Sequence, residues 1–497
     1  MILNTGLNSL KSRDIFKGDV KIIKKSKPGP VVFIVTNGLG AVEAVKKDSN
    51  FNVGDVVYIE GEVNEHKGRL QIELSSIKKS NMDFDTIILE KATPVRKDFS
   101  IKSNRYVTMR EIIIAIATRI RKAVLEGQPI MIRHHNDSDG IISGLCIEQG
   151  CLGLMRNLGI DPRYLLFRSP SKAPFYASGD VFRDLVLSKR FVESDSNIKP
   201  LIIVADNGST PEDAFGLNTL KTLGYEAIVI DHHNPVVLNN GITSVDEFVS
   251  LHLNPYKLGL DSKTSAGMLC YEIARYIWEK FENPLFPAVA GISDRCDIPE
   301  TELYISKTGK TRQELSEIGT AIDYISYQLK HDAGKGVYEE LFENFDFVKI
   351  VNSEVRKGFE TQLQSTLPYV RNQDINGILL STIDVGKYTI RFTYPAPGLV
   401  TSRIHEITAA ENDSNAVLTL GHIEDMIIIR ANKPVLPVQS IIKNLKQKFP
   451  NANVDGGGHE MAGTIRFVPA HKEELLEEIK TMLKNRPAPS EEDSQNS

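Results

Sequence analysis

Three times in the central part of the chain, a short run of mainly apolar residues ends in aspartate or in aspartate and histidine. Pro129–Ile132 precedes His134–Asp139, Leu201–Val204 precedes Asp206, and Glu226–Ile230 precedes Asp231–His233. Helical stretches separate these runs, which is the pattern of a parallel sheet covered by helices on both faces. Because the carboxyl ends of parallel strands meet at one edge of a sheet, the three polar clusters should converge there.

The residue types at these strand ends favour a metal site. Carboxylates and imidazoles placed this close together repel and desolvate one another unless a cation neutralises them, and divalent ions bind such oxygen-rich sites. Asp137, Asp139 and Asp206 supply carboxylates, and a fourth apolar segment, 288–292, leads to Asp294. A helix cap or a solvated turn would explain any one of these residues, but it does not explain three clusters at one edge.

Residues 1–80 are expected to form an all-β domain. Short apolar runs alternate with turn residues such as Lys27–Pro30 and Asn37-Gly38, which indicates a small barrel. The order of the runs, with Gly54–Val63 leading into a hairpin, resembles an OB-fold, a barrel that binds single strands by stacking bases on aromatic side chains beside basic ones. Aromatic residues in a small barrel are usually core, and protein contact is an alternative use. The candidate nucleic-acid contacts are Lys21, Lys24, Phe33, Tyr58 and Arg69.

Charge and composition narrow the class of protein. The net charge of −5 alone gives no support for a nucleic-acid partner, but residues 1–80 carry 13 Lys or Arg and only 9 Asp or Glu, so a mildly basic first domain precedes an acidic body. The four cysteines form no CxxC pair, so we expect neither a zinc knuckle nor a disulfide framework. Without an apolar window long enough for a membrane span, or a signal-peptide pattern, we expect a cytoplasmic protein with no membrane contact.

A length of 497 residues requires several domains, and we place their boundaries where the pattern changes. A linker over 81–108 leads to the parallel-sheet α/β domain over 109–300, and a helical spacer follows over 301–372. A smaller α/β domain over 373–484 has strand patterns that include Tyr388–Tyr394. Residues 485–497 should be disordered because they lack enough apolar side chains.

The last folded domain contains a second candidate site. Gly456, Gly457 and Gly458 precede His459 in what reads as a turn, where glycines expose backbone N–H groups to phosphate oxygens and the imidazole could donate to them. A glycine-rich turn is more often only a turn, so this feature is weak in isolation.

Taken in order, Asp206, Asp231-His232-His233, Asp294 and Gly456–His459 resemble the motifs of the DHH/DHHA1 phosphoesterase superfamily, and in particular its archaeal RecJ-like single-strand exonucleases. The resemblance covers about 109–484. It implies that the parallel-sheet domain binds two divalent ions, Mn²⁺ or Mg²⁺, and that the smaller DHHA1 domain closes over the phosphodiester.

The resemblance also implies roles for single residues. The residues that resemble metal ligands are His135, Asp137, Asp139, Asp206, His232 and Asp294, with Asp206 as the bridge between the two ions. The residues that resemble phosphate contacts are His233, Gly456–Gly458, His459 and, more loosely, Arg403. Catalysis would rest on Asp137, Asp139, Asp206 and His233.

The first motif departs from part of the superfamily. Many small-substrate members carry histidine four residues before the first motif aspartate, where this chain has Arg133. It offers His135 instead, which resembles the RecJ-like form. The choice between His134 and His135 as the metal ligand stays open.

Three functions are compatible with these features. The preferred one is two-metal hydrolysis of phosphodiester bonds in single-stranded DNA or RNA, in replication, repair or RNA processing and with partner proteins of those assemblies. The second is a phosphodiesterase for short oligonucleotides or cyclic dinucleotides. The third is a non-catalytic nucleic-acid-binding subunit, against which the costly clustered carboxylates argue.

Overall fold

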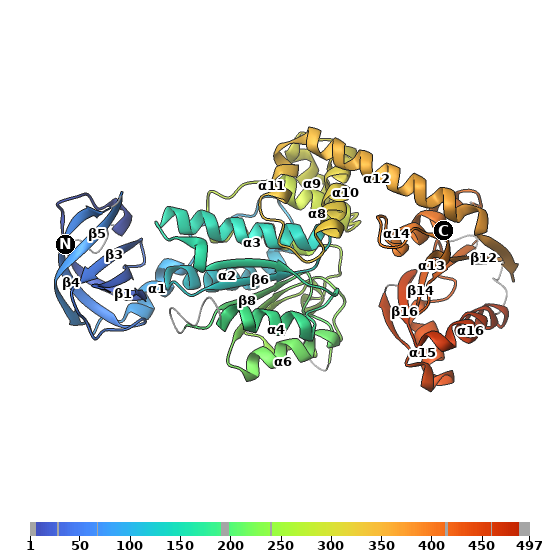
Figure 1. The fold of residues 1–497 in the computed structure, drawn as a ribbon, viewed down its shortest axis with the longest axis horizontal. Coiled ribbons are helices and arrows are strands. Elements are labelled where there is room, and N and C mark those ends of the chain that lie inside the picture. Colours follow the sequence, from blue (N-terminus) through green and yellow to red (C-terminus); the bar gives the residue numbers. More distant parts are fainter. Residues whose placement is uncertain are drawn as a thin grey trace. The chain divides into compact units, whose positions relative to one another are not determined.

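The computed structural model describes residues 6–26, 29–66, 68–189, 198–238, 241–412, 416–458 and 460–486. The chain divides into two compact units, residues 1–348 and 349–497, and each is described by itself (Figure 1). None of the helices in the described ranges combines the length and the apolar character needed to cross a bilayer. The expected tail, 485–497, lies almost entirely outside the described residues.

The first unit begins with a closed barrel of five strands, as expected. The strands are β1 (Ile15–Ser26), β2 (Val31–Thr36), β3 (Ala41–Lys46), β4 (Val56–His66) and β5 (Arg69–Lys79), and they neighbour one another in the order β1-β2-β3-β5-β4, with β4 pairing back to β1. The β3–β5 pair is parallel and the other pairs are antiparallel. Alternate side chains fill the interior, among them Phe16, Phe33 and Ile59. This confirms the OB-like barrel.

A five-stranded parallel sheet forms the centre of the first unit. Its strands lie in the order β10 (Leu251–Leu253), β9 (Glu226–Ile230), β8 (Leu201–Ala205), β6 (Ile130–His134) and β7 (Leu166–Pro170). Every residue of β6 and β8 is buried, as expected of strands covered on both faces. From β6 the chain passes to β7 on one side of it and then returns to β8 on its other side. The switch point of the topology therefore lies between β6 and β8. Ligands of open α/β sheets bind at such points.

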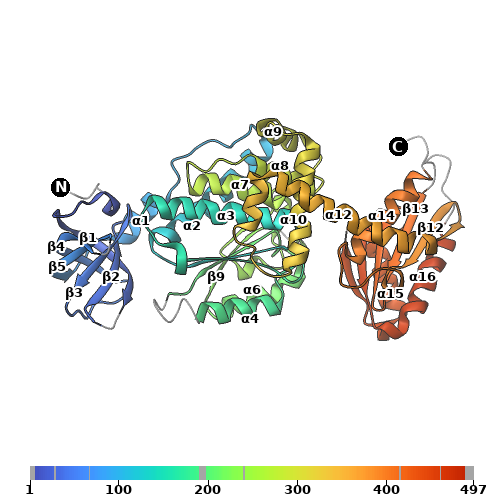
Figure 2. The same cartoon turned by 45° about the horizontal axis from the view of Figure 1, so that its top comes forward.

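Helices cover both faces of this sheet. On one face α2 (Asn104–Leu125), α3 (Ser138–Asn157) and α7 (Ala266–Ile277) pack together, and on the other lie α4 (Ser178–Leu187) and α6 (Ala214–Thr222) (Figure 2). The expected linker contains a helix, α1 (Phe84–Ala92), which Asp83 caps. The expected spacer is mainly helical, with α9 (Pro299–Thr308), α10 (Arg312–Leu329), α11 (Val337–Glu343) and α12 (Phe345–Thr366). Between the sheet and this segment, α8 (Leu285–Ser293) packs against α7 and α10.

The barrel is fixed at the amino-terminal edge of the parallel sheet. Ala41 N–H donates to Leu158 O at 3.0 Å, and Lys21 Nζ lies 3.1 Å from Glu126 Oε1, four residues before β6. A cavity of about 710 Å³ lies beside these contacts, and Pro129 and Leu165, which immediately precede β6 and β7, line it. The strand ends that carry the polar clusters lie at the opposite edge.

The second unit is built on a mixed sheet of six strands. They lie in the order β11 (Arg371–Ile375), β12 (Ile378–Asp384), β13 (Ala416–His422), β14 (Met426–Ala431), β16 (Ala462–Arg466) and β15 (Asp455–Gly458), with only β12 and β13 parallel. Side chains of the sheet form one hydrophobic core with α15 (Val438–Lys448) and α16 (Lys472–Lys484). Other side chains of the sheet form a second, smaller cluster with α14 (Pro397–Ala410).

The strand expected over 388–394 is wrong. The Asp384 side chain accepts from Lys387 N–H and turns the chain into a short helix, α13 (Val385–Tyr388), after which the backbone is irregular. The aromatic residues of this stretch pack locally, since the ring of Tyr388 stacks on that of Tyr369 with centroids 3.9 Å apart. The alternation of apolar residues over 388–394 therefore reflects local packing and not the pairing of a strand in the sheet.

Candidate metal centre

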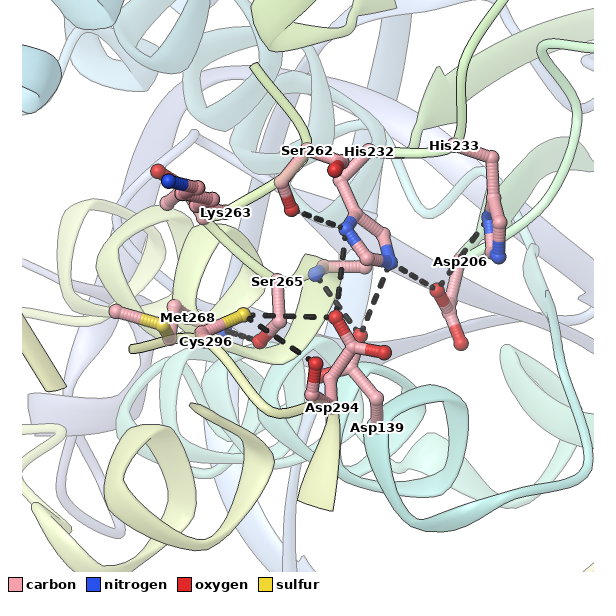
Figure 3. A network of polar contacts seen from close by, with 12 residues as sticks. Asp139, Asp206, His232, His233, Ser262, Lys263, Ser265, Met268, Asp294 and Cys296 are labelled. Carbon is pink, nitrogen blue, oxygen red and sulfur yellow. Dashed lines mark hydrogen bonds and ion pairs between the residues drawn. The ribbon is translucent and has the colours of Figure 1, made fainter. Parts of the chain in front are cut away.

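The carboxyl ends of β6, β8 and β9 bring their aspartate and histidine side chains together. His135 Nδ1 lies 3.0 Å from Asp137 Oδ2 and 3.5 Å from Asp206 Oδ2. His232 Nε2 lies 3.4 Å from Asp206 Oδ1 and 3.8 Å from Asp139 Oδ2 (Figure 3). Two sets of three residues are close enough to share an ion, one of His135, Asp137 and Asp206 and the other of Asp206, His232 and His233. Asp206 belongs to both sets.

The backbone turn after β8 places the Asp206 carboxylate. Asp206 has a φ of 58°, a left-handed conformation that is uncommon for a non-glycine residue and recurs at functional sites. Its N–H donates to Ile230 O at 2.8 Å, which ties the turn to the end of β9. The side chain is 1% exposed. The turn thus holds one buried carboxylate between the clusters that follow β6 and β9.

Two helix N-termini hold the aspartates of the first cluster. Asp137 caps α3, with Oδ1 accepting from Gly140 N–H at 2.9 Å while Oδ2 faces His135. Asp139 accepts from the N–H groups of Ala266 at 2.9 Å and Gly267 at 3.0 Å, at the start of α7. Helix N-termini stabilise negative charge. Asp137 is therefore both a cap and a candidate ligand.

Backbone contacts fix the tautomer of His232. Its Nδ1–H donates to Ser262 O at 2.8 Å, because a carbonyl oxygen can only accept. The other ring nitrogen, Nε2, faces Asp206 and Asp139 and is the atom left for a cation. An imidazole oriented through its second nitrogen in this way is the usual form of a histidine metal ligand.

Asp231 orients the two histidines that follow it. Its carboxylate accepts from Ser209 N–H at 3.1 Å, from His232 N–H at 2.8 Å and from the His233 ring Nδ1–H at 2.8 Å. Asp231 is fully buried, and these bonds occupy its oxygens. Asp231 was expected only as a member of its motif, without a role of its own; its position between β9 and two histidines was the available signal.

The geometry favours His135 over the adjacent His134 as the candidate ligand. His134 is fully buried, with Nδ1 2.6 Å from His135 O and Nε2 3.3 Å from Arg168 Nη1. Burial and the Arg168 charge lower the pKa of His134 well below its usual range. Arg133 points to the other face of the sheet, where its guanidinium pairs with Asp184. Successive side chains of a strand alternate between faces, and only His135, after the last strand residue, turns towards the cluster.

Asp294 lies at the edge of the cluster. It follows α8, and its Oδ2 is 3.6 Å from His232 Nδ1 and 3.4 Å from Cys296 Sγ. Among the described residues, the two sets of three include neither Asp294 nor Asp139. Figure 3 shows both carboxylates beside the His232 ring. The assignment of Asp294 as a ligand therefore stays a proposal.

The cluster holds competing charges. Burial and the Asp206 and Asp294 charges raise the pKa of Asp139 well above its usual range. Burial lowers the pKa of His232, but the neighbouring carboxylates, Asp206 first, reverse this effect and raise it well above its usual range. Carboxylates and imidazoles here compete for protons, and a divalent cation would compete for the same lone pairs.

Two buried atoms without a hydrogen bond support a cation at this place. Among the described residues, Asp206 Oδ1 and His135 Nδ1 are buried and make no hydrogen bond, although each lies near an oppositely charged group, His232 and Asp137 respectively. Unpaired buried polar atoms are costly, and both atoms belong to the residues that could share an ion. Carboxylate oxygens with imidazole nitrogens form a donor set that suits Mn²⁺ or Mg²⁺.

The barrel residues expected to contact nucleic acid lie in different environments. Phe33 is fully buried in the barrel core, so its expected stacking role is wrong, because β2 directs this side chain inward. Lys21 pairs with Glu126 of the parallel-sheet domain. Tyr58 is half-buried, and Lys24 and Arg69 line the cavity at the edge of the sheet.

The candidate phosphate residues of the second unit also differ from expectation. Gly456–Gly458 form the edge strand β15, paired with β16, instead of an open turn. A Cβ at Gly456 would lie 2.3 Å from Thr464 O, so close strand packing requires glycine there. His459 lies outside the described residues. Arg403, on α14, is exposed and pairs with Glu406 at 2.8 Å.

Comparisons with known proteins agree with this architecture. No family model matches the chain. An uncharacterized protein of Methanocaldococcus jannaschii, MJ1198, is 33% identical over 520 residues, which cover 94% of this chain and 68% of that protein. A solved DHH domain, from a protein described as a member of a family of ribosomal proteins, is 32% identical and has a TM-score of 0.77, over 81% of this chain and 97% of that chain.

RecJ exonuclease structures share the fold at lower identity. One, bound to manganese, is 17% identical with a TM-score of 0.51 and covers 77% of this chain and 96% of that chain. RecJ of Thermus thermophilus in complex with Mn²⁺ is also 17% identical with a TM-score of 0.51, over 80% of this chain and 57% of that chain.

Proposed function

Because the chain belongs to the DHH phosphoesterase superfamily, we propose that it hydrolyses phosphodiester bonds of single-stranded nucleic acid with the help of divalent metal ions. The observation that carries this proposal is Asp206, a buried carboxylate in a left-handed turn that belongs to both sets of candidate ligands. The fold shared with RecJ exonucleases and the OB-like barrel support the choice of substrate.

His135, Asp137 and Asp206 would hold one ion, and Asp206, His232 and Asp139 the other, with Asp294 beside the second. Bound Mn²⁺ or Mg²⁺ supplies an activated water molecule and neutralises charge on the reacting phosphate. Ser262 O keeps the proton of His232 on Nδ1, which leaves Nε2 for coordination.

His233 is suited to contact the scissile phosphate. Burial lowers the pKa of His233, but the charges of Asp231 and Asp206 raise it to about 9, which favours a ring that carries both protons. Nδ1–H is used by Asp231 at 2.8 Å, and Nε2–H can donate to a phosphate oxygen. Such a charge-assisted hydrogen bond is stronger than a neutral one.

The direct test is hydrolysis of end-labelled single-stranded DNA and RNA in Mn²⁺ and in Mg²⁺, with sizing of the products. We expect Asp206→Ala to abolish turnover while the circular dichroism spectrum and Tm stay close to wild type, because the backbone N–H of Asp206, and not its carboxylate, ties the turn to β9. Asp48→Ala, an exposed aspartate of the barrel, is the matched control. Unchanged turnover of Asp206→Ala in metal-replete buffer would contradict the proposal.

A phosphodiesterase for short oligonucleotides or cyclic dinucleotides is the second candidate. The barrel contacts the amino-terminal edge of the sheet, away from the strand ends with the ligands, so chemistry on a short substrate would not need it. Cleavage of di- to tetranucleotides without cleavage of longer strands would favour this second function.

A further inference from the structure

Helix α10 contacts the loop that carries the first metal cluster. Asp323 Oδ1 accepts from Ser138 N–H at 2.8 Å and from Ser138 Oγ–H at 2.8 Å. Ser138 Oγ also lies 2.6 Å from Gly319 O, so its single hydrogen is shared between two acceptors on α10. The segment expected to act only as a spacer therefore reaches the residue between Asp137 and Asp139.

The same helix holds the residue before Asp137. Asn136 Nδ2 donates to Lys330 O at 2.6 Å, just beyond the end of α10, and Ser326 Oγ lies 3.3 Å from Asn136 O. Lys330 has a φ of 58°, which belongs to the turn that ends the helix. Asn136 and Ser138 thus alternate with the candidate ligands His135, Asp137 and Asp139, and α10 holds both of them.

We propose that Asp323 is a positioning residue that orders the His135–Asp139 loop for metal binding, an inference that rests on the proposed function. Its hydrogen bonds go to Ser138, which is not a candidate ligand, so it can fix the loop without occupying a ligand atom. Residues that orient ligands through hydrogen bonds commonly control affinity because a disordered loop must pay for its ordering when the ion binds.

A purely structural explanation is that Asp323 adds to the capping of α3 and has no effect on metal binding. Ser138 N–H is one of the donors that a helix N-terminus leaves unsatisfied, and a carboxylate there interacts well with the helix dipole. A cap of this kind would change the free energy of unfolding but not the affinity of the folded protein for metal. The two roles therefore differ in a measurable quantity.

The test is calorimetric titration of the full-length protein with MnCl₂, without nucleic acid and below the Tm of every variant. We expect Asp323→Ala to weaken manganese affinity by about 10–100-fold. Asp323→Asn should restore most of the affinity, since its amide oxygen accepts the same two hydrogen bonds. Gln328→Ala, exposed on the same helix, should bind like wild type.

Activity gives a second readout. Asp323→Ala should lower kcat at subsaturating metal and leave KM for nucleic acid unchanged, because Asp323 contacts the ligand loop and is not a proposed substrate contact. A wild-type protein that binds no manganese would contradict the proposed function. A wild-type protein that binds it, with an Asp323→Ala variant that binds it equally well, would contradict only this inference.

Asp323→Glu keeps the test decisive if the alanine variant does not fold. The longer side chain retains the charge but displaces the accepting oxygen, so its manganese affinity should fall below that of Asp323→Asn. Affinity equal to wild type in both of these variants would overturn the positioning role.

Discussion

At the scale of single residues, the candidate centre depends on which atom of each side chain is already occupied. Asp231 and Ser262 each bind the Nδ1–H of one histidine, so both rings present Nε2 to the site. Asp137 uses one oxygen for a helix cap and presents the other. Hydrogen bonds within the protein therefore decide which atoms of these side chains remain for a cation or a phosphate.

The Asp231 carboxylate should set the alkaline limit of activity. A histidine whose pKa is raised in the folded protein keeps its proton up to that pKa. The Asp231 charge raises the pKa of His233, so the wild-type protein should keep phosphate contact above the ordinary histidine pKa. In Asp231→Asn the charge is removed, and the alkaline limb of the kcat profile should move down towards the ordinary histidine pKa of about 6.5. Profiles of both proteins from pH 5 to 10 would measure this shift; coincident limbs would contradict it.

The ligand types could be predicted from the sequence, but their orientation could not. Aspartates and histidines at three strand ends implied a shared site, because parallel strands end at one edge. The separation of His134 from His135 depends on where β6 ends and on the buried Arg168 beside His134. The left-handed turn at Asp206 and the contact from Asp323 have no local signature in the chain.

At the scale of elements, β6 links the site to the opposite face of the sheet. Arg133 is 4% exposed and lies between Asp184 and Asp180, with which it forms ion pairs. Burial, opposed in part by the Arg133 charge, raises the pKa of Asp180 to about 6. This buried network joins β6 to α4. Its arginine, Arg133, stands at the sequence position where many small-substrate members of the superfamily carry a histidine.

Removal of the Arg133 guanidinium should destabilise the first unit. Arg133→Ala leaves two buried carboxylates without their partner, which typically costs about 3–5 kcal/mol of unfolding free energy. Arg183→Ala breaks a more exposed pair with the same Asp180 and should cost about 1 kcal/mol or less. Urea unfolding of both variants would compare them, and equal losses would contradict the buried network as the cause.

Central strands were predictable and edge strands were not. β6, β8 and β9 are mainly apolar because helices cover them on both faces. β7 contains Arg168 and Pro170, and β10 has only three residues around His252, so neither carries a strong strand pattern. In the second unit the run 388–394 alternates like a strand, but the cap at Asp384 diverts it.

At the scale of the whole chain, the first unit combines a barrel, a parallel sheet and the helices that cover it. Lys24 and Arg69 face the cavity between barrel and sheet, while the candidate ligands follow the other ends of the strands. Under the proposed function, recognition of the substrate and its cleavage would take place on separate surfaces of this unit.

The two basic residues should affect long substrates selectively. Lys24→Ala combined with Arg69→Ala should raise KM for long single strands and reduce the salt dependence of their binding, because each phosphate contact releases counterions. The kcat value and the cleavage of very short oligonucleotides should stay unchanged. Kinetics with substrates of graded length would measure the effect, and an equal change for all lengths would contradict it.

Under the proposed function, the attachment of the barrel before β6 would affect which molecules are cleaved efficiently. The five residues of β6 separate the two edges of the sheet by roughly 16 Å, at about 3.3 Å per residue. A single-stranded nucleic acid bound at the barrel would have to span at least this distance, around the helices, before its phosphates reach the candidate aspartate ligands. Substrates above a threshold length would gain a second point of attachment, and the protein would discriminate between nucleic acids by their length without reading a single base.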